Sequence, residues 1–375
     1  MGDSLGLIAL ILYTAHTTGD PRAVALLLLV GDFLPSLLTP LTSGLADRFD
    51  RKTVMIGCEL ARGVVFTVIA LVRPSFVPLL LLVFAQAAIG QAFQPASRAA
   101  VAGLVEDDHL EAANAALGLG TNGLEVLGPI VAAAALPFLG LRGVLLIDAG
   151  TFAVSALILL RLPRLRVSLE EGQRASFLAR TREGLTEIWR RPVVRAIAIG
   201  FFLVVAFTGV DDVALVFMGR ALGAGDAGTS ILYAGSGVGL LVGLAVLSRW
   251  PKVAPAMLLL VAGFALSSGG NLLTGIAWAV PVAFLTQSLR GVGISMNDTG
   301  VNTLVHRLVP SRLHGRVFGN LYGAVGVAAG VSYLIGGQLV AMFGPRTVFI
   351  GAGAGGLITA LLLAVALRRL AAAAR

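Results

Sequence analysis

Five ionisable side chains inside long apolar stretches of the sequence are candidates for binding what crosses a membrane. They are Asp32, Glu125, Asp211, Asp212 and Arg290. A charged group that faces lipid is costly, so charges in such stretches usually mark ion or substrate pathways. Because a buried carboxyl group can take up and release a proton near neutral pH, Asp32, Glu125 and Asp211 are predicted to be proton or cation sites. The alternative is a salt bridge to Arg290 that does no more than lock helices together.

Uncharged polar residues recur in the same stretches at helical spacing. The polar stripes comprise Gln86, Gln91 and Gln94; Asn114, Thr121 and Glu125; and Thr286, Arg290 and Asn297. Such residues either line a substrate cavity or form hydrogen bonds between helices, and the sequence allows both interpretations. Asp212 stands about 100° round a helix from Asp211, so the two carboxylates are not expected to face one cavity squarely.

A short charged segment, residues 43–53, separates two of the apolar runs. Its sequence is Ser43-Gly44-Leu45-Ala46-Asp47-Arg48-Phe49-Asp50-Arg51-Lys52-Thr53. Each flanking run approaches the roughly 20 residues that a helix needs to cross a bilayer, so the segment is expected to be a loop at a membrane face. It is either a gate that holds one side of the protein closed or an anchor that fixes topology.

The composition identifies the elements that must hold these residues. The chain has 375 residues, of which 57% are hydrophobic and 13% charged, and its mean hydropathy is +0.90. Soluble domains carry nearer 25% charged residues, so we predict an all-α integral membrane protein with many spans. The 47 glycines suit close contact between helices in lipid. Cys58 is the single cysteine of the sequence, so there is no disulfide framework.

The cations are distributed very unevenly between the two sets of loops. When the loops are taken in alternation, 21 of the 28 Lys and Arg residues fall in the set that contains residues 43–53, and five fall in the other set. This asymmetry follows the positive-inside rule and places that set in the cytoplasm. The net charge of +8 is therefore explained by membrane topology, and no nucleic-acid partner is expected.

The apolar runs predict eleven helices after a short first one. The expected ranges are 22–46, 53–73, 76–98, 108–138, 143–161, 193–219, 227–249, 253–273, 276–305, 312–343 and 345–367, with kinks at Pro35, Pro40, Pro95 and Pro129. The first run, Leu5–Ala15, is about 16 Å of helix, which covers half of a bilayer core of about 30 Å. We therefore predict that the first helix is truncated at its N-terminal side, or is a short helix whose end reaches water.

One long polar stretch divides the chain. Residues 162–192 predict an amphipathic helix on the cytoplasmic surface, with Phe177, Thr181, Leu185 and Ile188 sharing one face. This gives an N-terminal bundle over 1–161, a linker over 162–192 and a C-terminal bundle over 193–375. A faint internal repeat at an offset near 200 residues is consistent with two similar halves.

Several short motifs, taken in order, resemble the major facilitator superfamily of secondary transporters. Asp47-Arg48 and Arg51-Lys52 match its signature loop, with Ser43 and Asp50 where the family prefers glycine. Phe93–Arg98, Gly128-Pro129, Ile147–Phe152 and Gly315-Arg316-Val317 resemble its macrolide-efflux branch. The resemblance implies a 12-helix fold of two six-helix halves. It also implies a cytoplasmic gate, which Glu59, Arg62 and Asp298 are expected to support. The other expected members of the gate are Ser43, Gly44, Asp47, Arg48, Arg51, Lys52 and Arg98. The chain departs from many proton-coupled drug antiporters at Gln86, where they carry arginine.

Other motifs are set aside. Gly118–Gly123 and Gly351–Gly356 fit a dinucleotide fingerprint, but neither follows a strand. The sequence has no P-loop and no HExxH, and its four histidines lack metal-ligand spacing, so no cofactor, metal or enzymatic activity is expected. We predict a monomeric exporter in a bacterial cytoplasmic membrane, which moves a hydrophobic or amphipathic small molecule in exchange for protons or another cation. The alternatives are a siderophore or biosynthetic-metabolite exporter, and a membrane scaffold or receptor that does not transport.

Overall fold

The computed structural model describes residues 2–36, 50–104, 110–163, 177–249 and 254–373. Within these ranges every regular element is a helix. The chain divides into two compact units, Met1–Arg174 and Ala175–Arg375, and each is described by itself. The described part of the chain contains seven helices that are long and apolar enough to cross a membrane, and the longest of them has 60 residues.

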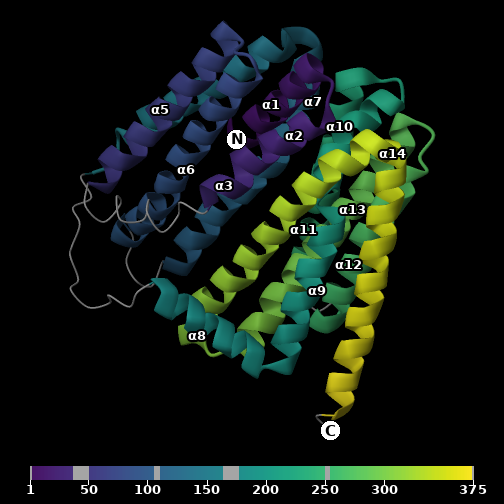
Figure 1. Ribbon diagram of the computed structural model, residues 1–375. Helices are drawn as coiled ribbons and strands as arrows, with labels where there is room; N and C mark the ends of the chain where they lie inside the picture. Colours follow the sequence, from purple (N-terminus) through teal and green to yellow (C-terminus); the bar gives the residue numbers. More distant parts are fainter. Residues whose placement is uncertain (1, 37–49, 105–109, 164–176, 250–253, 374–375) are drawn as a thin grey trace. The chain divides into compact units, whose positions relative to one another are not determined.

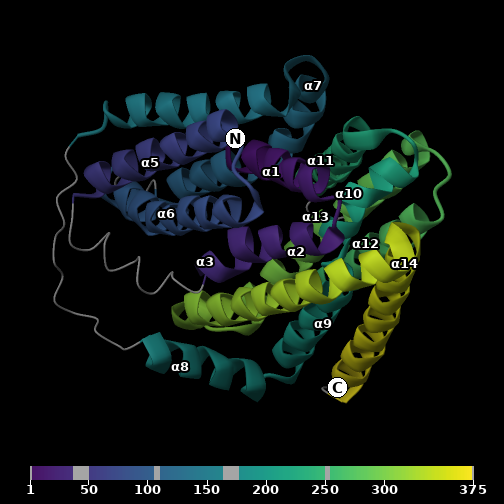
Figure 2. The ribbon, with the colours of Figure 1, turned by 45° about the horizontal axis from the view of Figure 1, so that its top comes forward.

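The first unit is built from helices that pack mainly on α7. Its elements are α1 (Gly2–Thr18), α2 (Pro21–Leu28), the π-helix η1 (Leu29–Phe33), α3 (Leu34–Ser36), α5 (Arg51–Val72), α6 (Phe76–Leu104) and α7 (Leu110–Leu159). Gly140 has φ +60°, and α7 folds back on itself there (Figure 2). The two arms of α7 correspond to the separate helices predicted over 108–138 and 143–161, and one left-handed glycine is enough to turn the chain between them. Phe66 of α5 stacks on Phe152 of α7, with ring centroids 5.5 Å apart.

The helix predicted over 22–46 is not regular in its described part. The backbone N–H of Leu34 bonds to the carbonyl of Leu29, five residues back, which closes the π-turn. Pro35 follows at once and has no N–H to donate, so the regular i→i−4 ladder is broken at this point. π-turns of this kind are frequent at functional sites, and Asp32 lies within this one.

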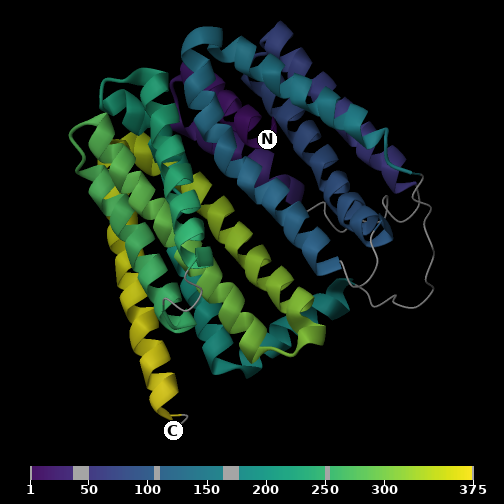
Figure 3. The same cartoon turned by 180° about the vertical axis from the view of Figure 1, so that it is seen from behind.

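The second unit consists of long helices that run side by side, with one shorter helix across their ends (Figures 1 and 3). The elements are α8 (Phe177–Arg190), α9 (Pro192–Thr208), α10 (Asp211–Ala221), α11 (Gly225–Arg249), α12 (Ala256–Gly275), α13 (Val280–Leu308), the 3-10 turn η3 (Ser311–Leu313) and α14 (His314–Ala373). Gly344, with φ +76°, divides α14 into two arms, which correspond to the separate helices predicted over 312–343 and 345–367.

The helix predicted over 193–219 is interrupted at one turn. Thr208 ends α9 and Asp211 begins α10, with Gly209 and Val210 between them. Both residues keep right-handed helical dihedral angles, and Pro192–Ala221 remains one stretch that is long and apolar enough to cross a membrane, as the sequence predicts. The break places Asp211 and Asp212 in the first turn of a helix, where the partial positive charge of the helix terminus favours a carboxylate.

Glycines set the close packing of α11, α12 and α13. A methyl group at Gly291 of α13 would overlap the carbonyl oxygen of Ser236 in α11. On the opposite face of α13, a methyl group at Gly293 would lie 2.7 Å from the carbonyl oxygen of Gly263 in α12. Larger residues would push these backbones apart, so the glycines hold the polar residues of three helices within hydrogen-bonding reach.

Candidate functional site

A buried ion pair lies between α10 and α13 in the second unit. Asp211 is 3% exposed, and its Oδ2 lies 2.6 Å from Nη2 of Arg290. The same oxygen accepts a hydrogen bond of 2.9 Å from Nδ2 of Asn271 on α12. Arg290 also donates from Nη1 to Oγ of Ser236 on α11, at 3.0 Å. Four helices therefore meet at one carboxylate and one guanidinium.

Asp212 has a different set of partners from its neighbour. Tyr333 of α14 donates to its carboxylate at 3.3 Å, and Tyr233 of α11 donates to its backbone carbonyl at 2.7 Å. The adjacent carboxylates thus tie the start of α10 to different helices, Asp211 to α12 and α13 and Asp212 to α14.

The polar network continues along α12 and α13 beyond the ion pair. Oγ1 of Thr274 lies 2.7 Å from Oγ1 of Thr286 and accepts a hydrogen bond of 3.0 Å from Nε2 of Gln287. Asn271, Thr274 and Gln287 are at most 1% exposed. The sequence analysis identified Arg290 and Thr286 but missed Asn271, Thr274 and Gln287. The signal was present, because Asn271 and Thr274 are one turn apart in a mainly apolar run without charged residues.

Four polar atoms of this network are buried without a hydrogen-bond partner among the described residues. They are Oδ1 of Asp211, Nε of Arg290, Oδ1 of Asn271 and Oε1 of Gln287. An unsatisfied buried polar atom costs about 1–3 kcal/mol, so such a group usually bonds to water or a ligand. The Arg290 side chain keeps 16% of its surface exposed, which gives the pair a route to solvent. The arrangement can therefore bind a polar group beside the Asp211 carboxylate and the Arg290 guanidinium.

A second buried cation, Arg62, lies in the first unit on α5. It is 7% exposed, donates from Nη2 to Oε1 of Gln86 on α6 at 3.1 Å, and its Cζ stands 4.6 Å from the ring centre of Phe152. Glu59, one turn earlier on α5, is 6% exposed. Gly90 of α6 lies beside the guanidinium, and a methyl group there would make ordinary contact with Cζ of Arg62, at 3.4 Å. An arginine at position 86 would place two cations in contact, so the glutamine is the partner that suits Arg62.

The remaining predicted polar residues have mixed surroundings. Asp32 and Gln94 are exposed, and Gln91 and Asp298 are half-buried. Asn297 is 6% exposed and packs its backbone against Gly263. Glu125 and Thr121 lie in α7, but their side chains are outside the described part of the structure, as is the side chain of Arg98.

The predicted gate is described only in its second part. Ser43, Gly44, Asp47 and Arg48 lie outside the described residues. Asp50 is the N-cap of α5, where its carboxylate accepts from the backbone N–H of Thr53 at 3.0 Å. This is a physical reason for aspartate where the family prefers glycine.

Two basic residues follow this cap in the first turn of α5. Lys52 donates from Nζ to the carbonyl oxygens of Leu160 and Leu162, at 2.8 and 2.6 Å, and so binds the end of α7, where a cation suits the helix dipole. Arg51 is half-buried. The bonds made by Lys52 therefore join α5 to α7 at this end of the first unit.

Helix α8 packs on the start of α14. Asn320 donates to the carbonyl of Thr181 at 3.0 Å, Arg316 pairs with Glu183, and Ile188 lies in the hydrophobic core of the unit. Gly184 faces the Arg316 backbone, whereas Leu185 is 43% exposed. Of the predicted face, Ile188 is therefore buried within the unit and Leu185 is not. The helix docks through its smallest residue, which lets the two backbones approach.

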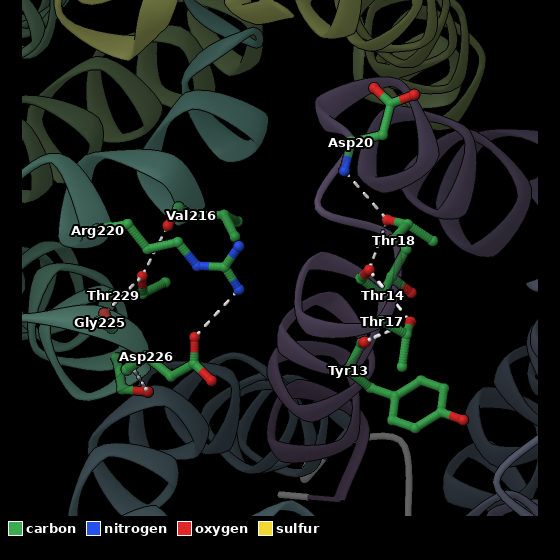
Figure 4. A network of polar contacts seen from close by, with 11 residues as sticks. Tyr13, Thr14, Thr17, Thr18, Asp20, Val216, Arg220, Gly225, Asp226 and Thr229 are labelled. Atoms are coloured by element: carbon green, nitrogen blue, oxygen red, sulfur yellow. Dashed lines mark hydrogen bonds and ion pairs between the residues drawn. The ribbon is translucent and has the colours of Figure 1, made fainter.

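Figure 4 shows a contrasting ion pair at the turn between α10 and α11. Nη2 of Arg220 lies 3.3 Å from Oδ1 of Asp226, and each side chain is about one-third exposed. Thr229 donates to the carbonyl of Val216 at 2.8 Å beside it. A pair so exposed contributes about 0–1 kcal/mol, so it serves as an internal reference for the buried pair. In the first unit, the same view shows Thr18 accepting from the N–H of Asp20, the residue that caps α2.

Comparison with known proteins adds family-level information. The sequence profile described as Major Facilitator Superfamily matches residues 1–319 and 212–374. The chain is 26% identical over 364 residues to YfiS of Bacillus subtilis (strain 168), named an uncharacterized MFS-type transporter, covering 94% of this chain and 87% of that protein. It is 28% identical to BacE of Bacillus subtilis, named as a candidate bacilysin exporter, over 58% of this chain and 55% of that protein.

Solved transporter structures share the fold. A POT family transporter in complex with 5-aminolevulinic acid superposes with a TM-score of 0.73 at 15% identity, covering 97% of this chain and 93% of that one. The nucleoside transporter NupG superposes with a TM-score of 0.68 at 14% identity, covering 98% of each chain. At these identities the likeness concerns the fold alone.

Proposed function

Because the chain belongs to the major facilitator superfamily, we propose that it is a secondary transporter that exports a hydrophobic or amphipathic small molecule in exchange for protons. The observation that carries this proposal is the buried pair of Asp211 and Arg290, with polar atoms left unsatisfied beside it. Ionisable groups inside membrane-spanning segments are expensive and are kept where ions or substrates bind.

The coupling step follows from the chemistry of the pair. The ionised Asp211 carboxylate can accept a hydrogen bond from a donor group of the substrate through Oδ1, and protonation of the carboxylate releases that donor. Proton and substrate then compete for one carboxylate, which is what exchange in opposite directions requires. Asn271 and Ser236 hold the two side chains in place through both steps, because each bonds to one of them. In the first unit, Asp32, Glu125 and the polar residues of α6 are proposed as further proton or substrate contacts.

The twelve-span architecture remains part of the proposal. It comprises bundles over 1–161 and 193–375, with 162–192 as the linker, in a bacterial cytoplasmic membrane. It is supported by the division of the chain into two units and by the match to the superfamily profile. It is also supported by α7 and α14, each of which is a pair of helices separated by a left-handed glycine. The gate is proposed to combine Asp47 and Arg48 with Arg51, Arg98 and Asp298 at the cytoplasmic face.

Export is the proposed direction because BacE is named as an exporter. The test is transport in proteoliposomes with an imposed pH gradient, using a lipophilic cationic dye, a macrolide and a small peptide as separate cargoes. We expect one class to accumulate against its gradient, on the acidic side of the membrane, and accumulation to stop when a protonophore dissipates the pH gradient. Movement only of polar metabolites would favour a biosynthetic-metabolite exporter. If no cargo moves under any ion gradient, the result favours the alternative function, a membrane scaffold or receptor that does not transport.

A further inference from the structure

Two histidines meet at the turn that joins α13 to α14 in the second unit. His306 lies in the last turn of α13, and His314 is the first residue of α14. Their ring centroids are 4.5 Å apart, and the ring planes make an angle of 66°. The sequence gives no metal motif here, because Pro310 stands between the two histidines. The turn through η3 brings them together.

Each imidazole is held by a backbone carbonyl group. Nδ1 of His306 lies 2.7 Å from the carbonyl oxygen of Asn302, and Nε2 of His314 lies 2.8 Å from that of Val309. A carbonyl oxygen only accepts, so these two ring nitrogens carry the hydrogens. In the neutral rings the lone pairs then belong to Nε2 of His306 and Nδ1 of His314. Histidines that bind metal ions are usually fixed in this way, with the other ring nitrogen donating to a carbonyl or carboxylate.

The spacing of the two rings suits one metal ion shared between them. Zinc binds imidazole nitrogen at about 2.0–2.1 Å, and tetrahedral angles then place the centroids of two coordinated rings about 5 Å apart. The observed 4.5 Å is within a small side-chain rotation of this value. The ring of Phe318 packs against both imidazoles, with its centroid 5.1 Å from that of His306 and 6.4 Å from that of His314. An apolar neighbour therefore restrains both rings.

The surroundings of the pair indicate which class of ion it suits. The histidines lie where the apolar sequence gives way to Arg307 and Arg312, so the arginines oppose a cation and the ring nitrogens must supply the affinity. Among the described residues no third histidine, cysteine or carboxylate joins the pair, so water or another ligand would complete the shell. Imidazole ligands suit Zn²⁺, Ni²⁺ and Cu²⁺, whereas Mg²⁺ and Ca²⁺ take oxygen ligands.

We propose that His306 and His314 bind one divalent transition-metal ion of the zinc class, through Nε2 and Nδ1 respectively. The ion would join the end of α13 to the start of α14, and it would stabilise the folded chain by mass action. The proposal rests on the two rings and the carbonyl groups that orient them. It does not depend on the proposed export activity.

The test is calorimetric titration of the full chain, in detergent micelles and without an affinity tag, with Zn²⁺ and separately with Mg²⁺. His306→Gln and His314→Gln each remove one ligand. The matched control is a chain in which the other two histidines of the sequence, His16 and His109, are both replaced by glutamine. Pulsed electron paramagnetic resonance of the Cu²⁺ complex of this control chain counts the imidazoles bound to the metal, and it needs neither ligand variant.

We expect one Zn²⁺ to bind per chain, with no heat of binding from Mg²⁺. Each ligand variant should weaken Zn²⁺ binding at least about tenfold, since loss of an orienting partner alone costs about 10–100-fold. The control chain should bind as wild type does, and its copper spectrum should show two imidazoles. Binding of Zn²⁺ by both ligand variants at wild-type affinity, no binding by the wild type, or a copper spectrum with fewer than two imidazoles would overturn the proposal. If a ligand variant does not fold, the copper spectrum decides the question.

Discussion

Removal of Arg290 should show how strongly the second unit depends on its buried charge pair. Arg290→Leu deletes the cation 2.6 Å from Asp211 and leaves the hydrogen bond from Asn271 to that carboxylate. Loss of one member of a buried pair costs about 3–5 kcal/mol, because the other charge stays desolvated. Since 16% of the Arg290 side chain is exposed, we expect the lower end, about 3 kcal/mol.

The matched control is Arg220→Leu in the surface pair with Asp226, for which we expect about 0–1 kcal/mol. Both variants are unfolded by SDS titration from mixed micelles, and the free energies of unfolding are compared with wild type. The double variant Asp211→Asn with Arg290→Gln should recover most of the loss, because neither neutral amide leaves a buried charge. If Arg290→Leu is no more destabilising than Arg220→Leu, the pair is not desolvated and the reasoning fails.

Three further predictions concern the gate and the packing. Asp47→Asn should slow transport in proteoliposomes without much loss of folded protein; an unchanged rate would argue against the gate. Gly291→Ala should lower the free energy of unfolding by about 1–3 kcal/mol, because the added methyl group overlaps Ser236. Its control is Gly319→Ala, where a methyl group meets no atom within 4 Å and the change should stay within about 0.5 kcal/mol in the same unfolding assay. Asp50→Ala should lower the free energy of unfolding by about 1 kcal/mol, because α5 loses its N-cap. Asp50→Asn keeps a capping oxygen and should retain most of that stability. Equal losses in the two variants would show that capping is not the role of Asp50.

Much of the fold could be predicted from the sequence because hydropathy and charge asymmetry report membrane spans directly. The boundaries of α5, α11 and α13 lie within a few residues of their expected ranges. The break before Asp211 could not be predicted, because an apolar Gly-Val pair does not interrupt a hydropathy pattern. The turns at Gly140 and Gly344, by contrast, fall at the helix boundaries that the sequence predicts, between 138 and 143 and between 343 and 345.

The charged residues of the site could be predicted from the sequence, but the residues to which they bond could not. Asp211 and Arg290 stood out because a charge in an apolar run is rare. That they bond to each other, and that Asn271 and Ser236 complete the set, depends on how α10 to α13 pack. The partner of Gln86 could not be predicted either. It accepts a hydrogen bond from Arg62 only because α5 and α6 are neighbours, which the sequence alone does not reveal.

The most direct test of the central claim is proton-driven transport by Asp211→Asn, measured beside Asp226→Asn in the same proteoliposomes. The account predicts that Asp211→Asn loses at least about tenfold of its uphill accumulation under a pH gradient, the rate equivalent of about 1.4 kcal/mol. Exchange of labelled for unlabelled cargo should continue, and Asp226→Asn should behave as wild type. Uphill transport by Asp211→Asn at the wild-type rate would contradict the claim that this carboxylate couples proton movement to export.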